Sequence, residues 1–432
     1  MIVHAVGLEN ISKFWVGLRA LKLGGAVMLT SDTFESIEFL SSAPERDLKS
    51  FRKQPIWPSF SGDLVEFLDL LSKELMENQN LREFPDVAAF AFFCRKANIN
   101  SLCSPSKQNL LAVGRGIVFH LAPSNVPINF AFSWLMGFVT GNLNIVRLPS
   151  KNYRQINIVL EAISQVSKKN KQGFIEDRSL FIRYDKNSNA TREISLISDI
   201  RMIWGGDAKI SDVRRHPIPA KAYDIPFADR YSICALSSKE IAKSPDLQSL
   251  AKAFFNDTFL SDQNACTSPH LIFWVGKKAE SLDARISFWR EVQKLLEKKS
   301  EIETSVGLDK LHTFCLQSDK FNVKRLEPKN SNNLWLVELI QLEKGIEEIR
   351  SHSGYFLEFF TEDLSDMGQV VNSKYQTLSY FGFNRSDLKN LILKLSLDGI
   401  DRVVKVGHAQ EFSPQWDGYD LTEMLTRKID IR

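Results

Sequence analysis

Short apolar runs alternate with amphipathic stretches through the middle of the chain. Apolar runs of this length, bounded by turn residues, are typical of buried strands. The predicted strands are 116–121, 143–148, 201–204 and 232–236. Apolar positions that recur at the spacing of one helix face give the predicted helices 128–139, 152–167, a segment after Asp207, and 246–257. Strands and helices in alternation indicate an α/β fold with a parallel sheet.

The alternation continues on both sides of this region. Upstream, the predicted helices are 63–71 and 85–97, with Pro85 near the first turn of the second. Downstream, the predicted strands are 271–275, 334–342 and 355–360, and the predicted helices are 281–299 and 387–395. Residues 1–60 mix turns with short β-like runs such as 24–29. Because 432 residues are too many for one core, we expect more than one domain.

Composition narrows the class of protein. Hydrophobic residues make up 44% and charged residues 25%, as in ordinary soluble proteins. The net charge of +3 is small for this length and gives no reason to expect a nucleic-acid partner. The longest apolar region, 126–146, is interrupted by polar residues and does not predict a membrane span. Residues 1–6 lack the basic start and apolar stretch of a signal peptide, so we expect a cytoplasmic protein.

The cysteines point to chemistry rather than to cross-linking. Five are present, at 94, 103, 234, 266 and 315, with no C-x-x-C pair and no cluster at metal-ligand spacing. We therefore predict neither a disulfide framework nor a metal site. Cys266 lies in a loop of small polar residues, 261–269, directly before the apolar run 271–275. A thiol there is placed to attack a bound carbonyl, although many lone cysteines are simply small core residues.

A second window is the turn after the first predicted strand of the middle region. Asn125 stands there between Pro123 and Pro127. Its amide could donate a hydrogen bond to an oxyanion. It could equally stabilise the turn, which Asn and Pro favour on their own.

Two further windows are suited to binding a nucleotide. At the end of the strand 143–148 stand Arg147, Pro149, Ser150 and Lys151, which could meet a phosphate beyond the carboxyl ends of the strands or form a solvated loop. Gly205, Gly206 and Asp207 join a strand to a helix. Glycines allow close approach of a dinucleotide, and a helix N-terminus favours anions. No G-x-G-x-x-G follows a strand, which argues against an ordinary dinucleotide fingerprint.

Taken in order, these windows resemble the aldehyde dehydrogenase superfamily and, within it, the LuxC-type acyl-CoA reductases of the bacterial bioluminescence system. The resemblance covers roughly residues 110 to 425. It rests on these stretches: His120–Pro127, Gly141–Asn142, Val146–Ser150, Trp204–Asp207, Gln263–Pro269, Tyr375–Thr377, Asp401–Val404 and Trp416–Tyr419.

The resemblance implies the fold, the reaction and the site. The implied fold is aldehyde dehydrogenase-like, with a cofactor-binding and a catalytic α/β domain and the active site in the cleft between them. The implied reaction is reduction of a fatty acyl thioester to the aldehyde with NADPH. Cys266 would attack the thioester carbonyl to give an acyl-enzyme, and Asn125 with the Cys266 backbone N–H would hold the oxyanion. The implied cofactor-binding residues are Arg147, Pro149, Ser150, Lys151, Gly205, Gly206 and Asp207.

The chain departs from the superfamily pattern in three places. Oxidising relatives carry a water-activating Glu where we align Pro226, so a base for hydrolysis is missing, although Asp229 could be a displaced one. NAD-preferring relatives often carry a Glu where Lys151 stands, and a cation there suits the 2′-phosphate of NADPH. A clear Glu-Ile-Phe-Gly-Pro motif, which contacts the nicotinamide ribose, is absent.

Two histidines invite attention. His120 lies in an apolar strand and is interpreted as a packed core residue, while His270 follows the cysteine loop and could lower the pKa of the thiol.

The expected domain limits follow from these assignments. Residues 1–60 form an N-terminal extension packed on the cofactor domain, 61–232 the cofactor-binding domain, 233–410 the catalytic domain with the cysteine, and 411–432 a C-terminal tail. The expected partners are a fatty acyl-CoA or acylated protein as substrate, an acyl-protein synthetase, and further copies of the chain in a homo-oligomer.

Two alternatives stay open at this point. One is another acylating or oxidising aldehyde dehydrogenase. The other is an inactive relative that serves as a scaffold in an acyl-transfer complex.

Overall fold

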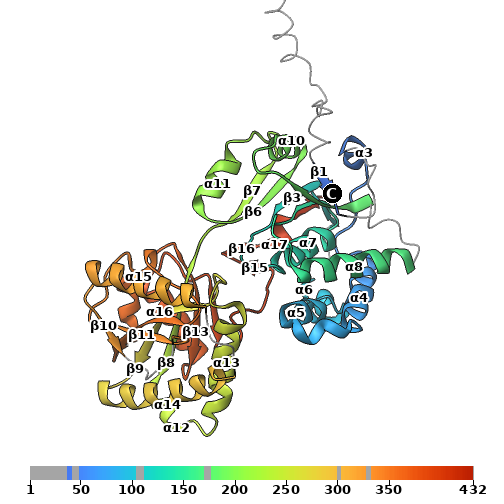
Figure 1. Ribbon diagram of the computed structural model, residues 1–432. Coiled ribbons are helices and arrows are strands. Elements are labelled where there is room, and N and C mark those ends of the chain that lie inside the picture. Colours follow the sequence, from blue (N-terminus) through green and yellow to red (C-terminus); the bar gives the residue numbers. More distant parts are fainter. Residues whose placement is uncertain are drawn as a thin grey trace, which may run out of the picture.

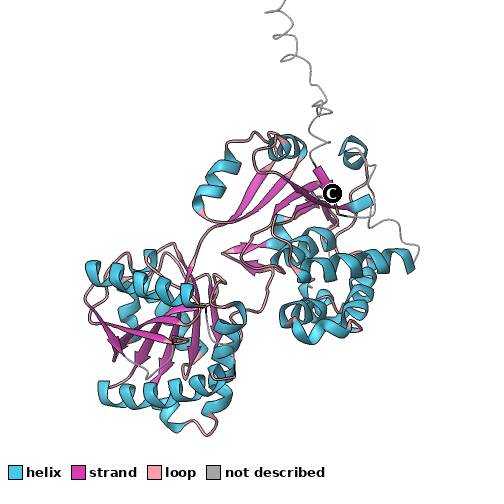
Figure 2. Ribbon diagram, in the orientation of Figure 1, coloured by secondary structure: helices cyan, strands magenta, loops and turns pink. Residues whose placement is uncertain are grey.

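The structure, a computed structural model, describes residues 37–40, 48–103, 111–169, 177–298, 303–326 and 332–431. These residues form two α/β units, each built on its own sheet (Figures 1 and 2). The apolar run 24–29 lies outside the described residues, as does most of the expected N-terminal extension.

The first sheet has six strands in the order β1-β5-β4-β3-β6-β7. Its strands are β1 (Ile37–Phe39), β3 (Ile117–Leu121), β4 (Leu143–Arg147), β5 (Ser179–Tyr184), β6 (Ile200–Trp204) and β7 (Tyr223–Phe227). All pairs are parallel except β1 with β5. The chain runs outward from β3 through β4 to β5 and then returns to β6, so the strand order reverses between β3 and β6.

Side chains alternate between the two faces of this sheet, as they must in a strand. Val118, Val146 and Met202 belong to one core, which α4, α5, α7 and α8 complete. Phe119, Ile145 and Ile203 belong to another, completed by α3, α10 and α11. The helices of this unit are α3 (Leu48–Arg52), α4 (Gly62–Met76), α5 (Pro85–Phe93), α6 (Lys96–Leu102), α7 (Asn129–Val139), α8 (Arg154–Lys169), α10 (Ala190–Ile197), α11 (Asp207–Arg214) and the 3-10 turn η1 (Gln79–Glu83).

The second sheet has seven strands in the order β10-β11-β12-β9-β8-β13-β14, and only the β10–β11 pair is antiparallel. Its strands are β8 (Tyr231–Ser237), β9 (Pro269–Val275), β10 (Val323–Leu326), β11 (Trp335–Leu339), β12 (Tyr355–Thr361), β13 (Tyr375–Phe381) and β14 (Arg402–Lys405). The helices and 3-10 turns are α12 (Ser238–Lys243), α13 (Leu247–Thr258), η3 (Phe259–Ser261), α14 (Lys278–Leu296), α15 (Thr304–Lys320), η4 (Ile346–Glu348), η5 (Leu364–Gln369) and α16 (Arg385–Leu395). The helices α12, α13 and α14 cover one face of the sheet.

The chain crosses between the units twice. The first crossing is the short link 228–230 between β7 and β8. The second follows β14, after which the chain returns to the first unit, as the red segment in Figure 1 shows. This C-terminal segment contains β15 (Gln415–Trp416), β16 (Tyr419–Asp420), α17 (Leu421–Met424) and β17 (Thr426–Ile429), which pairs with β2 (Leu111–Gly114). Trp416, Leu421 and Leu425 are buried in the core of the first unit.

One predicted helix was wrong in its extent. The expected helix 85–97 is two helices, α5 and α6, because the backbone at Arg95 is extended. Lys96 is the first residue of α6, and its N–H donates to the Asp69 side chain on α4 (3.0 Å). This bond satisfies one of the N–H groups that the start of a helix leaves without a partner.

Candidate active site

The carboxyl-terminal edge of the first sheet carries the two nucleotide-suited windows and Asn125. Asn125 lies in the loop after β3, and Gly205 and Gly206 lie in the loop after β6. Since β3 and β6 are neighbours at the point where the strand order reverses, their loops open side by side. This is the place where open parallel sheets bind ligands.

The cysteine loop lies at the amino-terminal edge of the second sheet, where its parallel strands begin. Cys266 stands between η3 and β9. The Ser232 hydroxyl on β8 donates to the carbonyl of Cys266 (2.6 Å), and the N–H of Thr377 on β13 donates to the same hydroxyl (3.3 Å). The loop is therefore fixed to the starts of two neighbouring strands.

Gln263 anchors the cysteine loop through hydrogen bonds to the neighbouring strands. Its backbone is left-handed (φ +61°), as is that of Asp262 (φ +48°), which turns the chain sharply after η3. The buried Gln263 amide donates to the carbonyls of Pro269 and Tyr355 and accepts the N–H of Gly354 and Tyr355, all at 2.9–3.0 Å. A side chain with four such bonds leaves the loop little freedom.

One hydrogen bond joins the two edges. The Asn125 amide donates to the carbonyl of Asn264 (3.1 Å), which lies 139 residues further along the chain and two residues before Cys266. The Asn125 side chain is exposed, so it can exchange this partner for a bound group. Cys266 itself packs against the core of the first unit. The structure thus places the predicted nucleophile loop and the predicted oxyanion donor next to each other.

The surroundings of Cys266 keep its thiol protonated at neutral pH. Burial, and then the negative charge of Asp417, raise the pKa of the thiol to about 12. A hydrogen bond from Gln376 and the positive charges of Arg402 and Arg230 act in the opposite direction. The thiol therefore needs a proton acceptor before it can attack.

Gln376 and Asp417 are the residues that sequence reasoning missed. Both lie in stretches that carried the family resemblance, yet neither received a role. Gln376 stands at the start of β13, and its amide donates to the Asp417 carboxylate at the turn of the β15–β16 hairpin. The Asp-Gly pair in a hairpin turn is the one signal that could have drawn attention to this segment.

Positive charge gathers at the nucleotide-suited edge. Arg147 ends β4, and its buried Nε has no hydrogen-bond partner among the described residues. Lys209 on α11 donates to the carbonyls of Ala122 (3.1 Å), directly after β3, and Trp204 (2.8 Å), the last residue of β6. Burial, and then the charge of Arg147, lower the pKa of Lys209 to about 8. An anion near these two cations would be stabilised by both.

The glycine turn is shaped by Lys209 on one side and is open on the other. At Gly205 (φ +154°) a Cβ atom would lie 2.6 Å from Cδ of Lys209, so only glycine fits. Gly206 caps α11, and a Cβ atom there would meet nothing within 4 Å. The first turn of α11, beginning at Asp207, thus has free space before it, and its backbone N–H groups favour an anion.

The remaining predicted cofactor residues follow β4. Lys151 is exposed, and its Nζ lies 5.1 Å from the centre of the Tyr153 ring, whose hydroxyl donates to the carbonyl of Ser124 (2.6 Å). This contact places the Lys151 loop beside the Asn125 turn. Pro149 accepts a hydrogen bond from Arg183 (3.0 Å), while Ser150 is exposed.

The histidines are not placed for catalysis. His120 is buried between Ser133 (2.8 Å) and Asn144 (3.0 Å), and burial lowers its pKa to about 4, which fits the core interpretation. His270 stacks on Tyr231, and burial, followed by the charges of Arg350 and His352, lowers its pKa to about 3. A neutral His270 supplies no charge that would lower the pKa of the thiol.

Neither the alternative base, Asp229, nor the other cysteines share the surroundings of Cys266. Asp229, the possible displaced base, is exposed and pairs with Arg350. Cys94 and Cys234 are buried, and burial raises the pKa of both thiols. Cys315 is exposed on α15.

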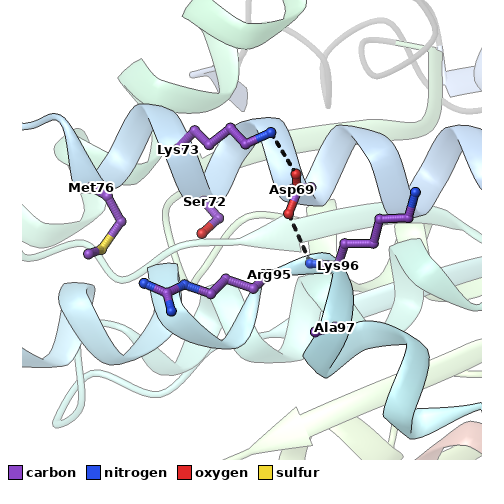
Figure 3. A pocket seen from close by; sticks show the side chains of 7 residues that line it. All are labelled: Asp69, Ser72, Lys73, Met76, Arg95, Lys96 and Ala97. Atoms are coloured by element: carbon purple, nitrogen blue, oxygen red, sulfur yellow. Dashed lines mark hydrogen bonds and ion pairs between the residues drawn. The ribbon is translucent and has the colours of Figure 1, made fainter.

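A hollow on the surface of the first unit belongs to neither edge. Its volume is about 390 Å³ and it lies between α4 and the start of α6 (Figure 3). It is lined by Asp69, Ser72, Lys73, Met76, Arg95, Lys96 and Ala97, none of which is a predicted site residue.

Within the described residues, no group of three or more His, Cys, Asp and Glu side chains could hold a metal ion, and no helix is long and apolar enough to cross a bilayer.

Comparison with known sequences identifies relatives of this chain. The sequence profile of the family described as acyl-CoA reductase (LuxC) matches residues 100–427. A long-chain acyl-protein thioester reductase of Aliivibrio fischeri is 24% identical over 301 residues, which are 68% of this chain and 58% of that protein. The enzyme of the same name from Vibrio harveyi is 23% identical over 304 residues, 68% of this chain and 59% of that one. The matched region therefore spans less than two thirds of these relatives.

Comparison with solved structures identifies the fold. Aldehyde dehydrogenase 21 from Physcomitrella patens, in complex with the reaction product succinate, superposes with a TM-score of 0.62 at 10% identity, covering 92% of this chain and 89% of that one. A 1-pyrroline-5-carboxylate dehydrogenase from Thermus with bound NAD gives a TM-score of 0.60 at 12% identity, covering 88% and 82%. The chain has an aldehyde dehydrogenase-like α/β fold, as expected from the sequence.

Proposed function

Because the chain belongs to the LuxC family of acyl-CoA reductases, we propose that it reduces a fatty acyl thioester to the fatty aldehyde with NADPH, through an acyl-enzyme on Cys266. The observation that carries this proposal is the hydrogen bond from Asn125 to Asn264, because it sets an amide donor from the first unit beside the thiol loop of the second. Two groups from distant parts of the chain meet as the two halves of an acyl-transfer site.

In the acylation step, the Cys266 sulfur attacks the thioester carbonyl. The C–S bond to Cys266 forms, and the negative charge that develops on the carbonyl oxygen is held by the Asn125 amide and the Cys266 backbone N–H. Collapse of this intermediate breaks the bond to the leaving thiolate. The loop is well suited to the task, because Gln263 and Ser232 fix its backbone and Asn125 is exposed for the substrate.

The edge of the first sheet fits a dinucleotide. Three features of this edge suit phosphate groups. They are the Nε of Arg147, which has no hydrogen-bond partner within the described part of the chain, the charge of Lys209, and the open N-terminus of α11. The exposed Lys151 suits a 2′-phosphate, which supports NADPH over NADH. Arg147, Lys151, Lys209 and the first turn of α11 would hold the cofactor, which would supply the hydride for reduction of the acyl-enzyme.

The arrangement favours reduction over oxidation to the acid. The position we align with the water-activating Glu of oxidising relatives is Pro226, a half-buried residue within β7. Asp229 is exposed and engaged with Arg350, so it is not free to take that role. Without an activated water, the acyl-enzyme is left to hydride transfer.

The finer features of the reaction also belong to the proposal. The substrate is a fatty acyl-CoA or an acylated protein, and the relatives' names, which specify a long-chain acyl-protein thioester, support the second. An acyl-protein synthetase is the proposed donor in that case. The half-buried aromatic residues Phe93, Phe132 and Phe412 support an apolar acyl group, because they lie in the same core that Cys266 contacts. Phe132 stacks on Phe412, and Phe93 meets both rings edge to face. Cytoplasmic location and homo-oligomerisation complete the proposal.

The direct test is a reduction assay on the purified chain. Saturated acyl-CoA thioesters of increasing length are supplied with NADPH, and aldehyde formation is measured together with NADPH oxidation. Aldehyde and oxidised cofactor should appear in equal amounts with the native chain and with Cys315→Ala, the matched control thiol. Cys266→Ala should form none. Aldehyde production by Cys266→Ala would refute the proposal.

A further inference from the structure

The sequence motifs identify no base that could take the proton from the Cys266 thiol. Burial holds its pKa far above neutral, so attack at neutral pH requires proton removal. The positions considered from the sequence for a water-activating base supply no acceptor for the thiol either, since Pro226 has none and Asp229 is exposed and paired with Arg350.

A buried carboxylate of the C-terminal segment lies near the cysteine loop. Asp417 is only 9% exposed, although aspartate is rarely buried without a function or a partner. Its partner is Gln376, which is fully buried and donates to one Asp417 oxygen. The Ser232 hydroxyl joins the carbonyl of Cys266 to the N–H of Thr377, the residue after Gln376, so Gln376 and the cysteine loop lie side by side.

The segment that carries Asp417 is anchored at several points. Arg402 donates to the carbonyls of Ala409 (3.1 Å) and Glu411 (2.8 Å), and its guanidinium lies over the Trp416 ring at 4.6 Å. Phe412 stacks on Phe132 of α7 with ring centres 4.9 Å apart. These contacts fix the hairpin between the two units, so the position of Asp417 is determined by the fold rather than by a mobile loop.

We propose that Asp417 is the base that removes the proton from Cys266 and that Gln376 positions its carboxylate for this transfer. The proposal rests on the function proposed above. The proton passes from Sγ to Asp417 as the bond between Sγ and the thioester carbon forms. When the bond from that carbon to the departing sulfur breaks, the same proton is returned to the leaving thiolate. Asp417 ends ionised, and no further reactant is consumed in the acylation half-reaction.

The charges around Asp417 are consistent with this role. Burial raises the pKa of the Asp417 carboxyl above its ordinary value and the charge of Asp401 adds to this, while the hydrogen bond from Gln376 and the charges of Arg230 and Arg402 lower it. Tyr419 on β16 and Cys266 complete the set of titratable groups that face it. A base whose pKa lies closer to neutral accepts a proton more readily than an ordinary carboxylate.

The turn itself permits a clean test. Asp417 (φ +48°) and Gly418 (φ +76°) are both left-handed, as in the two-residue turns that suit hairpins. Asparagine-glycine is favoured in such turns as strongly as aspartate-glycine. If Asp417 were present only for the turn, Asp417→Asn would therefore behave as the native chain.

The experiment measures acylation alone. Labelled acyl-CoA is mixed with the chain in the absence of NADPH, and thioester formed on the protein is quantified by rapid quench between pH 6 and pH 10. The native rate should fall at low pH as Asp417 becomes protonated. Asp417→Asn should be slower by about 10²- to 10⁴-fold at pH 7, the usual worth of a positioned base. Its rate should then rise about tenfold per pH unit, because it depends on thiolate formed by hydroxide.

The matched control is Asp229→Asn, which removes an exposed acid in the link between β7 and β8 and should keep the native rate and pH profile. Asp417→Asn acylated at high pH and then returned to pH 7 should be reduced by NADPH at the native rate. An Asp417→Asn chain with native acylation at pH 7 would overturn the assignment, and so would a slowed rate whose pH profile is unchanged. Absence of thioester on the native chain would instead overturn the proposed function.

Discussion

Replacing Asn125 with alanine separates its chemical role from its contribution to the fold. In the structure its amide makes one hydrogen bond, to the carbonyl of Asn264, at 3.1 Å and on an exposed side chain. A neutral hydrogen bond of this kind contributes about 0.5–1.5 kcal/mol, so its loss should change the midpoint of thermal unfolding only slightly. Loss of an oxyanion donor costs about 2.7–4 kcal/mol of transition-state stabilisation, or roughly 10²- to 10³-fold in rate.

The assay is a single-turnover acylation of the chain by labelled acyl-CoA, run beside an unfolding measurement on the same sample. We expect Asn125→Ala to bind acyl-CoA and to unfold almost as the native chain does, yet to form the thioester at least about 10²-fold more slowly. Tyr153→Phe is a useful control, since it removes a hydroxyl that only braces the neighbouring carbonyl of Ser124. If Asn125→Ala acylates within a few-fold of the native rate, the oxyanion role is refuted.

Three further outcomes follow from the same structure. Lys151→Glu should weaken NADPH binding and narrow or reverse its advantage over NADH, measured by fluorescence titration; equal affinity of the native chain for both cofactors would contradict the role of Lys151. Gln376→Leu should slow acylation by about tenfold or more while leaving hydride transfer to a preformed acyl-enzyme unchanged, and equal slowing of both steps would point to general damage. Because the pKa values of buried His120 and His270 are lowered in the folded state, unfolding takes up protons, and stability should fall as pH drops from about 6.5 towards 4 and 3. Denaturant unfolding from pH 7 to pH 4 should show this loss in the native chain and a smaller one in His270→Phe, whereas an identical slope in both would be inconsistent with a buried neutral His270.

The parallel sheets were predictable because their central strands are buried on both faces. Runs such as 117–121 and 269–275 are continuous and apolar, and the helices between them show one apolar face. The edge strand β7 escaped prediction, because it contains Asp224 and Pro226. Proline is tolerated at a sheet edge, and Asp224 is satisfied by a bidentate pair with Arg201 (2.7 and 3.0 Å).

The helix α15 was missed for a different reason. Its inward face carries Lys310, Thr313 and Gln317, while Leu308 and Leu311 are exposed. The buried Lys310 donates to the carbonyls of Asn332 and Ser353 (both 2.7 Å), and Phe314 is the residue of this helix that packs against Trp335. Hydrogen bonds therefore take the place of a continuous apolar face. A pattern search that looks for apolar faces cannot recognise such a helix.

Some residues of the candidate site could be predicted from the sequence, and others could not. Asn125, Cys266 and the glycine turn stand in motifs whose residue types already indicate their chemistry. Asp417 and Gln376 acquire meaning only from the fold, since they lie on different elements and meet through long-range packing of the C-terminal hairpin. No local spacing in the sequence relates them to Cys266.

The central claim is that Cys266 carries the acyl group between the thioester and the aldehyde. Its most direct test is to incubate the chain with labelled acyl-CoA without NADPH, digest it, and locate the label by mass spectrometry. We expect one acyl group, bound as a thioester on the peptide containing Cys266 and released as aldehyde when NADPH is added to the intact protein. A label on another residue, or aldehyde formation at the native rate by Cys266→Ser, would contradict the account.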